Sequence, residues 1–126
     1  MAKFITHRLI DELKTKKEID AKTNFTEIQV KVYEDVDILA FYDIHPLAPV
    51  HVLVIPKKHI AKLSEAGEED EDLLGKIQIV LSKIAKDLKI DDSFSVLLCN
   101  GEKAGQSVFH IHYHLRGGWE NPPKDI

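Results

Sequence analysis

The sequence has almost no cysteine, no long apolar run and no excess of positive charge. Cys99 is its only cysteine, which excludes an internal disulfide and any zinc cage built from thiolates. Its apolar runs, such as residues 52–56, are far shorter than the roughly 20 residues that cross a bilayer as a helix. Residues 1–8 lose their apolar character too early for a secretory signal. We therefore expect a cytoplasmic protein, with the nucleus as a second compartment.

The charge balance argues against nucleic acid as a partner. The formal net charge is −4 and the isoelectric point is about 5.9, whereas a domain that neutralises many phosphates needs a dense basic surface. An anionic ligand would have to be attracted locally, by histidines and backbone N–H groups. We expect neither a nucleic-acid partner nor a membrane partner.

Size and periodicity predict one α+β domain. The 126 residues are 44% apolar and 30% charged, which suits a single soluble core. Apolar residues at helical spacing from Leu73 to Leu88 predict one long amphipathic helix, and Ile5 to Leu13 predict a shorter one. Alternating residues predict about five strands in an antiparallel meander, because most connections are too short for parallel crossovers. The predicted strands lie within residues 28–32, 36–41, 50–55, 94–98 and 107–115.

Three histidines alternate along the last predicted strand. Successive side chains of a strand point to opposite faces, so His110, His112 and His114 would share one face and the apolar residues between them the other. Such a row could ligate zinc, perform covalent catalysis on phosphorus, or be a structural cluster. Gly105 and Ser107, just before the strand, favour phosphorus, because glycine lets the backbone approach a ligand and a hydroxyl suits phosphoryl oxygens.

Two stretches carry a resemblance to a known family. The run from Gly105 to Gly118 (GQSVFHIHYHLRGG) resembles the signature of the histidine-triad (HIT) family, and residues 39–60 are similar to the family's other long motif. Together the resemblance covers about residues 32–118. Gly-Gln-Ser-Val before the histidines and Gly-Gly after them look like the Hint branch, the nucleoside phosphoramidases. We accordingly divide the chain into a helical segment (about 1–26), a HIT core (about 27–118) and a tail (119–126).

The resemblance implies an activity and an assembly. The expected enzyme hydrolyses the P–N bond of adenosine or guanosine 5′-phosphoramidates through a nucleotidyl-histidine intermediate, needs no cofactor or metal, and is a homodimer. The C-terminal segment of each protomer would reach toward the active site of its partner. Trp119, in that segment, would contact the partner's site. Many family members carry a Cys-x-x-Cys near the N-terminus that can hold zinc with histidines, but this sequence lacks it. His59 is therefore expected to be structural.

The resemblance also assigns roles residue by residue. His112 would be the nucleophile and His114 the proton donor, relayed through Ser107, while His110 and His51 hold the geometry and charge of the site. An unperturbed histidine is largely uncharged near neutral pH, so one ring nitrogen of His112 can attack while the other donates to a backbone carbonyl. Substrate would be bound by Asp43 at the ribose, Ile44 at the base, Asn100 at the phosphate or ribose, and Gly105, Gln106 and Ser107 at the phosphate and leaving group.

Three other functions are compatible with the family resemblance. The first is a dinucleoside polyphosphate hydrolase of the fragile-histidine-triad branch, against which Ser107 and the Gly-Gly ending argue. The second is a nucleotide-binding adaptor whose activity is incidental. A DNA deadenylase of the aprataxin kind fits less well, because this acidic chain has no basic appendage for DNA.

Overall fold

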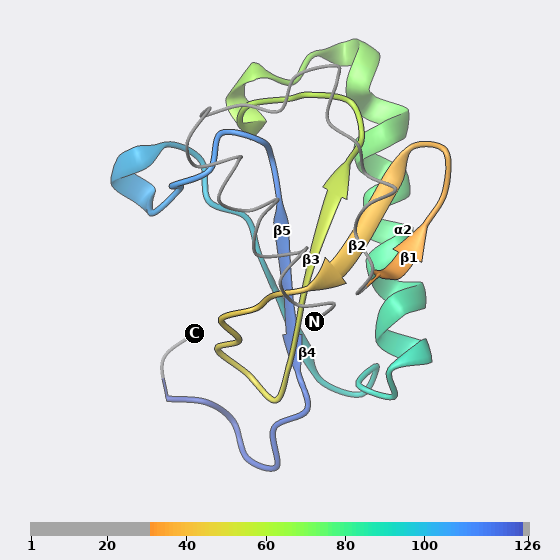
Figure 1. Ribbon diagram of the computed structural model, residues 1–126, viewed down its shortest axis with the longest axis vertical. Helices are drawn as coiled ribbons and strands as arrows, with labels where there is room; N and C mark the ends of the chain where they lie inside the picture. Colours follow the sequence, from red (N-terminus) through yellow and green to blue (C-terminus); the bar gives the residue numbers. More distant parts are fainter. Residues whose placement is uncertain (1–30, 125–126) are drawn as a thin grey trace.

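The computed structural model describes residues 31–124 and confirms the α+β class (Figure 1). Its elements are, in chain order, β1 (Lys31–Glu34), β2 (Ile38–Tyr42), β3 (Val50–Pro56), α2 (Glu71–Asp87), β4 (Phe94–Leu97) and β5 (Tyr113–Gly117). Short 3-10 turns lie at Leu63–Glu65, Glu68–Asp70 and Glu102–Ala104. The predicted first helix and the start of the first predicted strand lie outside the described residues. No helix in the described part is long and apolar enough to cross a membrane.

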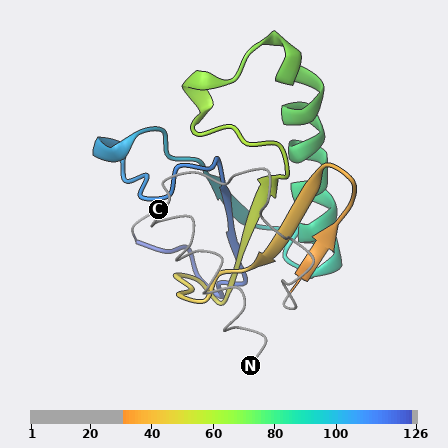
Figure 2. The same cartoon turned by 45° about the horizontal axis from the view of Figure 1, so that its top comes forward.

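The five strands form one antiparallel sheet in the order β1-β2-β3-β5-β4. The prediction of a meander is therefore wrong after β3. The connection through α2 passes over one face of the sheet and delivers β4 to the far edge (Figures 1 and 2). Strand β5 then returns between β3 and β4, so it is a central strand with a partner on each side.

The helix α2 covers one face of the sheet because its apolar residues repeat at helical spacing. Acidic residues occupy its first turn and Lys86 its last turn, which complements the helix dipole. The core beneath it is formed by buried side chains from both layers: Ile77, Val80, Leu81, Ile84 and Ala85 of the helix with Ile38, Ala40, Val52, Val54, Tyr113 and Leu115 of the sheet. This layer gives the strands a rigid support.

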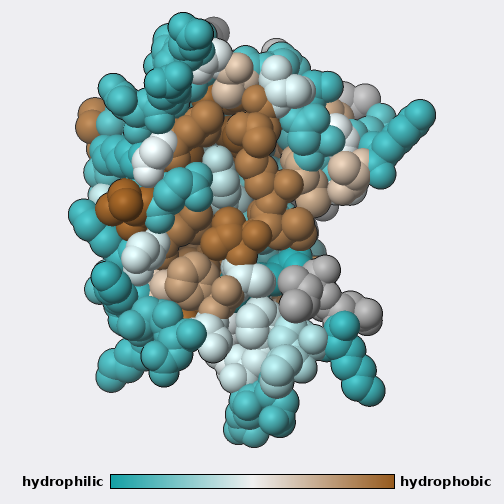
Figure 3. Space-filling model, turned by 180° about the vertical axis from the view of Figure 1, so that it is seen from behind, coloured by the Kyte–Doolittle hydropathy of each residue, from teal (hydrophilic) through white to brown (hydrophobic). Residues whose placement is uncertain are grey.

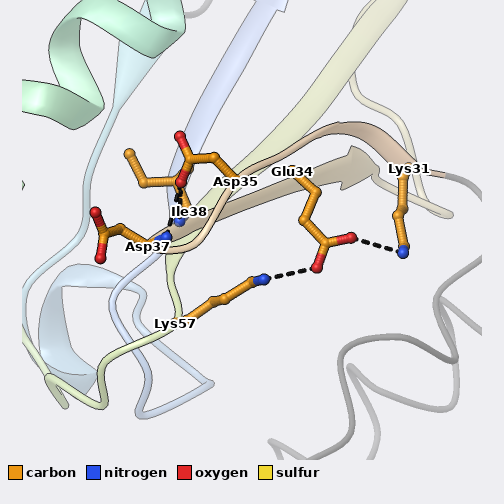
Figure 4. Close-up of polar contacts among 6 residues, drawn as sticks. All are labelled: Lys31, Glu34, Asp35, Asp37, Ile38 and Lys57. Carbon is orange, nitrogen blue, oxygen red and sulfur yellow. Dashed lines mark hydrogen bonds and ion pairs between the residues drawn. The ribbon is translucent and has the colours of Figure 1, made fainter.

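A tight turn joins β1 to β2 and is built around one carboxylate (Figure 4). Asp35 accepts the backbone N–H groups of Asp37 and Ile38, each at 2.8 Å, and the hydroxyl of Tyr33 at 2.7 Å. Burial raises the pKa of Asp35, but these hydrogen bonds outweigh it and lower the pKa to about 2. Beside the turn, Glu34 pairs with Lys31 and Lys57 at 2.7 and 2.6 Å.

The opposite face of the sheet carries the polar chemistry. Because β3 and β5 alternate, Val52 and Leu115 point toward α2, whereas His51 and its cross-strand partner Arg116 point the other way. His114 lies on this second face opposite Leu53. The fold therefore separates an apolar layer under α2 from a face on which histidines of two adjacent strands meet.

Candidate active site

The two adjacent strands β3 and β5 bring His51 and His114 into contact. Their Nε2 and Nδ1 atoms are 2.9 Å apart and their ring centroids 5.2 Å apart. His51 is buried and His114 half-buried. The prediction from strand parity that His51 shares a face with Leu53 is consistent with this arrangement. What sequence alone did not decide, namely that this face meets the histidine row, follows from the β3–β5 pairing.

Backbone contacts fix which nitrogen of each ring carries the proton. The N–H of Leu47 donates to Nδ1 of His51 at 3.0 Å, so a neutral His51 carries its proton on Nε2 and donates it to Nδ1 of His114. A neutral His114 then holds its own proton on Nε2. The pair is thus oriented so that an N–H group of His114 is available as a donor.

His112 carries its proton on the other ring nitrogen, Nδ1. Its Nδ1 lies 2.8 Å from the backbone carbonyl oxygen of His110, and because a carbonyl only accepts, this nitrogen carries the proton. Nε2 of His112 therefore keeps its lone pair. The rings of His112 and His114 are 5.1 Å apart between centroids. A nucleophilic nitrogen and an N–H donor accordingly stand side by side.

The expected row of three histidines on one strand is only partly correct. Strand β5 begins at Tyr113, and residues 107–112 are not extended strand. His110 is fully buried, with Nε2 donating to the carbonyl oxygen of Pro56 at 2.7 Å, and its ring is tilted against that of His59 with 5.4 Å between the centroids. The backbone N–H of Ile111 donates to Ile60 instead of continuing the sheet ladder. His110 thus lies beneath the site, and its carbonyl orients His112.

All of these imidazoles are shifted toward the neutral form. Burial lowers the pKa of His51, His112 and His114, the last to about 3, and nearby positive groups add to the effect on His114. Burial likewise lowers the pKa of His110 to about 4. At neutral pH the face therefore presents uncharged imidazoles.

Asp43 lies directly after β2, next to the start of β3. Its Oδ2 is 3.5 Å from Nε2 of His51, and its Oδ1 accepts the backbone N–H of His45 at 2.9 Å. Donor atoms of Asp43, His51 and His114 lie within 4.8 Å of one another, a spacing at which a metal ion could bind. The short His51–His114 hydrogen bond already places a proton between the two nitrogens, so the geometry fits proton transfer better than ligation.

The loop before the histidines is held by its own side chains. The amide of Gln106 is buried: its oxygen accepts the N–H of Gly101 at 2.8 Å, and its nitrogen donates to the carbonyls of Ala61 and Val108 at 2.7 and 3.0 Å. These bonds use the amide within the protein, so Gln106 shapes the loop, and its contact with phosphate stays a prediction.

The remaining residues predicted to bind substrate differ in exposure and backbone conformation. Ser107 is exposed and Ile44 half-buried, while Gly105 has a φ of 99°, a conformation that favours glycine. The side-chain oxygen of Asn100 accepts the N–H of Ser64 at 2.8 Å, which ties two loops together. No hydrogen bond joins Asn100 or Ser107 to the histidines within residues 31–124, so their roles stay predictions.

One site residue was missed from sequence. Arg116 follows His114 at the same parity on β5, and its Nε lies 3.5 Å from Nε2 of His51. Its charge lowers the pKa of His51 and of His114. The signal was available, because residue 116 continues the alternation of 112 and 114.

Comparisons with known proteins all match this chain to HIT proteins. The model of the HIT domain matches residues 25–121. Protein HitA of Neisseria gonorrhoeae is 43% identical over 101 residues, which cover 80% of this chain and 87% of that protein. A HIT family hydrolase from Clostridium thermocellum superimposes with a TM-score of 0.71 at 44% identity, covering 76% of this chain and 84% of that one. A histidine triad nucleotide-binding protein from Candida albicans gives 0.64 at 36% identity, covering 79% and 80%.

Proposed function

The chain belongs to the HIT domain family, and we propose that it is a nucleotide hydrolase that cleaves the P–N bond of purine nucleoside 5′-phosphoramidates. The observation that carries this proposal is that two neighbouring imidazoles hold their protons on different ring nitrogens. The carbonyl of His110 leaves a lone pair on Nε2 of His112, and the hydrogen bond from His51 leaves a proton on Nε2 of His114. Displacement at phosphorus needs a nucleophile and an acid within one substrate's reach.

In the first step, Nε2 of His112 attacks phosphorus as the P–N bond breaks. The anionic phosphoryl group of the bound substrate favours the protonated form of the His51–His114 pair, and the proton so held passes through His114 to the departing nitrogen. The products are a free amine and a nucleotide bonded to His112. His112 starts uncharged because burial lowers its pKa.

In the second step, water attacks phosphorus and the bond to His112 breaks. The His51–His114 pair, now lacking the proton it gave up, takes a proton from that water. The nucleoside monophosphate leaves and the site returns to its starting state. Atoms and charges balance with water as the only co-reactant, so the cycle as proposed uses no cofactor.

The nucleotide would lie across the ends of β2 and β3. The carboxylate of Asp43, beside the histidines, suits the paired hydroxyls of a ribose, because an ionised carboxylate accepts strong hydrogen bonds. Ile44 would line the base, and Gly105 and Ser107 would donate to phosphoryl oxygens. These contacts are compatible with adenine or guanine.

We also infer that the protein is a homodimer that covers strand β4. In the described chain β4 pairs only with β5, so its outer edge is open. Phe94, Val96 and Ile79 expose 37%, 41% and 60% of their surface, and apolar side chains gather on the face behind the sheet (Figure 3). An open apolar edge invites pairing with another strand. Light scattering should give twice the chain mass, and Val96→Lys should give the monomer; a wild-type monomer would contradict the inference.

The activity is tested with adenosine 5′-phosphoramidate, diadenosine triphosphate and a chelator. We expect turnover of the phosphoramidate that is unaffected by the chelator, and loss of at least about a thousandfold in kcat for His112→Ala. Lys83→Gln, which changes an exposed side chain of α2 on the other face of the sheet, serves as the control and should stay within a few-fold of wild type. Preference for the triphosphate would instead indicate a dinucleoside polyphosphate hydrolase, and full activity in His112→Ala would remove the nucleophile.

A trapped intermediate gives a second readout. Rapid denaturation during turnover should yield protein whose mass is increased by one nucleotidyl group, and His112→Ala should yield none. Binding of nucleotide without any turnover of either substrate would support the adaptor reading over the enzyme.

A further inference from the structure

The segment that follows β3 holds the segment that precedes β5. Residues 107–112 are not extended strand, so the sheet ladder does not fix their position. Backbone carbonyls of residues 56–61 accept hydrogen bonds from residues 106–111 instead, each at 2.7 Å: Pro56 from Nε2 of His110, Ile60 from the N–H of Ile111, and Ala61 from Nε2 of Gln106. The backbone just before the nucleophile is therefore positioned by a segment that is distant in the sequence.

One peptide group links this arrangement to His112. The carbonyl of His110 and the N–H of Ile111 belong to the same planar trans peptide, so they point in opposite directions. The N–H is held by the carbonyl of Ile60. On the other side, the carbonyl lies 2.8 Å from Nδ1 of His112. The bond to Ile60 thus fixes the orientation of the carbonyl that keeps the proton of His112 on Nδ1.

The side chain of Gln106 holds the acceptor side of this peptide in place. It is 2% exposed, and its two N–H groups donate to the carbonyl of Ala61, the residue after Ile60, and to that of Val108 at 3.0 Å. Its oxygen accepts the N–H of Gly101 at 2.8 Å. A side-chain amide offers two donors and an acceptor in one plane, whereas an ionised carboxylate of the same shape offers no donor. The contacts at position 106 therefore require an amide.

Loss of these bonds would reach the nucleophile through the backbone. Without Gln106, the carbonyl of Ala61 has lost its donor, and the adjoining Ile60 can shift. The peptide between residues 110 and 111 can then rotate, and Nδ1 of His112 loses its acceptor. In the other tautomer, Nε2 of His112 carries the proton and has no lone pair with which to attack phosphorus.

Building on the proposed cleavage of the P–N bond at His112, we propose that Gln106 is a positioning residue for this nucleophile. Through the Ile60–Ala61 segment it holds the peptide whose carbonyl keeps the proton of His112 on Nδ1. Gln106 acts through the backbone and does not touch the reacting atoms. This role differs from a contact with phosphate, because it affects the rate of the chemical step rather than the affinity for nucleotide.

The kinetic test uses Gln106→Met, which keeps the length of the side chain and removes its donors and acceptor. We expect kcat to fall about 100-fold, because a small misplacement of a reacting group can cost this much. The dissociation constant of adenosine 5′-monophosphate, measured by calorimetry, should stay within about threefold of wild type. Gln106→Glu, which keeps an acceptor and loses the donors when ionised, should show the same pattern and serves if the methionine variant does not fold.

Two controls separate positioning from a general loss of amide contacts or of stability. Gln78→Met removes an exposed amide on α2 whose nitrogen donates to the carbonyl of Leu74 at 3.2 Å, and it should keep the wild-type kcat. Ile84→Ala weakens the core on the other face of the sheet and should also keep it. A fall in kcat for Ile84→Ala as large as that for Gln106→Met would overturn the proposal. So would a loss of affinity in Gln106→Met that leaves kcat unchanged, because it would indicate a contact with phosphate.

The tautomer of His112 gives a readout that does not depend on activity. In protein labelled with ¹⁵N-histidine, the NMR signals of His112 are assigned by their absence from His112→Asn. Wild type and Gln78→Met should carry the proton of His112 on Nδ1, and Gln106→Met should show a mixture of tautomers. If wild type cleaves no P–N bond at all, this mixture still supports the positioning role although the proposed activity fails. An unchanged tautomer in Gln106→Met excludes that role, whatever the activity.

Discussion

The two faces of the sheet use the same strands for opposite purposes. Toward α2, Val52, Tyr113 and Leu115 are buried in a continuous apolar cluster. On the other face, His51, His114 and Arg116 alternate with them along the same two strands. Polar groups on that second face are held by hydrogen bonds to backbone and to each other. The face under α2 contributes folding free energy. The histidine face carries polar side chains in a geometry that burial alone would not favour.

The largest expected effect comes from weakening the apolar face. Ile84 of α2 is 1% exposed, and Ile84→Ala should lower the free energy of unfolding by about 3 kcal/mol through lost burial and a cavity. Denaturant titration measures the loss, while kcat below the transition should change little. Val36→Ala, at a site 83% exposed, is the control and should cost less than about 0.5 kcal/mol. Equal losses from the two variants would contradict the division of roles.

The histidine face should instead make stability depend on pH. Burial lowers the pKa of His110 from 6.5 to about 4, so this residue binds more protons in the unfolded state. Its stabilising contribution is complete above the unfolded pKa and is lost as pH falls from about 6.5 toward 4. Between pH 7 and pH 5 the contribution of His110 alone should fall by about 2 kcal/mol, and the other buried histidines, whose pKa values are also lowered, should add to the total loss.

Urea titrations at the two pH values measure this slope. His110→Gln should show a smaller pH-dependent loss than wild type, whatever its stability at pH 7. Ile84→Ala should keep the wild-type slope, because it removes no titrating group. A slope that is unchanged in His110→Gln would locate the pH dependence elsewhere.

Removing His51 should affect the chemistry more than the fold. His51 sets the tautomer of His114 through a 2.9 Å hydrogen bond but is expected to touch no reacting atom. His51→Ala should therefore lower kcat by about 10- to 100-fold, less than loss of the proton donor itself. His51→Gln, whose amide offers both an acceptor and a donor, should recover part of the rate. A fall in kcat/KM caused by KM alone would argue against this positioning role.

The apolar face could be predicted well because its signal is local. The spacing from Leu73 to Leu88 predicted a helix that the structure places at Glu71–Asp87, and the strand predicted at 94–98 is β4 (Phe94–Leu97). Strand order was not predictable in the same way. Whether β5 lies beside β3 depends on where the α2 connection delivers β4, which is a contact between distant parts of the chain.

On the site face, residue types were predictable but several orientations were not. Parity correctly grouped His114 with the site, yet Gln106 turns inward to bond Gly101, Ala61 and Val108, and His110 is buried against Pro56. Each orientation depends on carbonyls brought close by folding, for which sequence spacing carries no signal. Arg116 was overlooked although it continues the alternation of residues 112 and 114, because attention went to the histidines alone.

The smallest expected effect lies at the end of α2, on the side of the molecule that packs the core. Lys89 has a φ of 60°, and the N–H of Ile90 donates to the carbonyl of Ala85 at 2.9 Å, which is how a helix closes in a left-handed cap. A side chain with Cβ is strained there, so Lys89→Gly should raise the free energy of unfolding by about 0.5 to 1 kcal/mol, after allowing for the greater freedom of glycine in the unfolded chain. Lys86→Gly, one turn earlier inside the helix, should lower stability by about 1 kcal/mol. Thermal unfolding of the two variants should shift in opposite directions, and kcat should be the same in both, because this cap lies on the face that carries no chemistry. If Lys89→Gly also lowered stability, the left-handed cap would not be strained, and if either variant changed kcat, the separation of the two faces would fail.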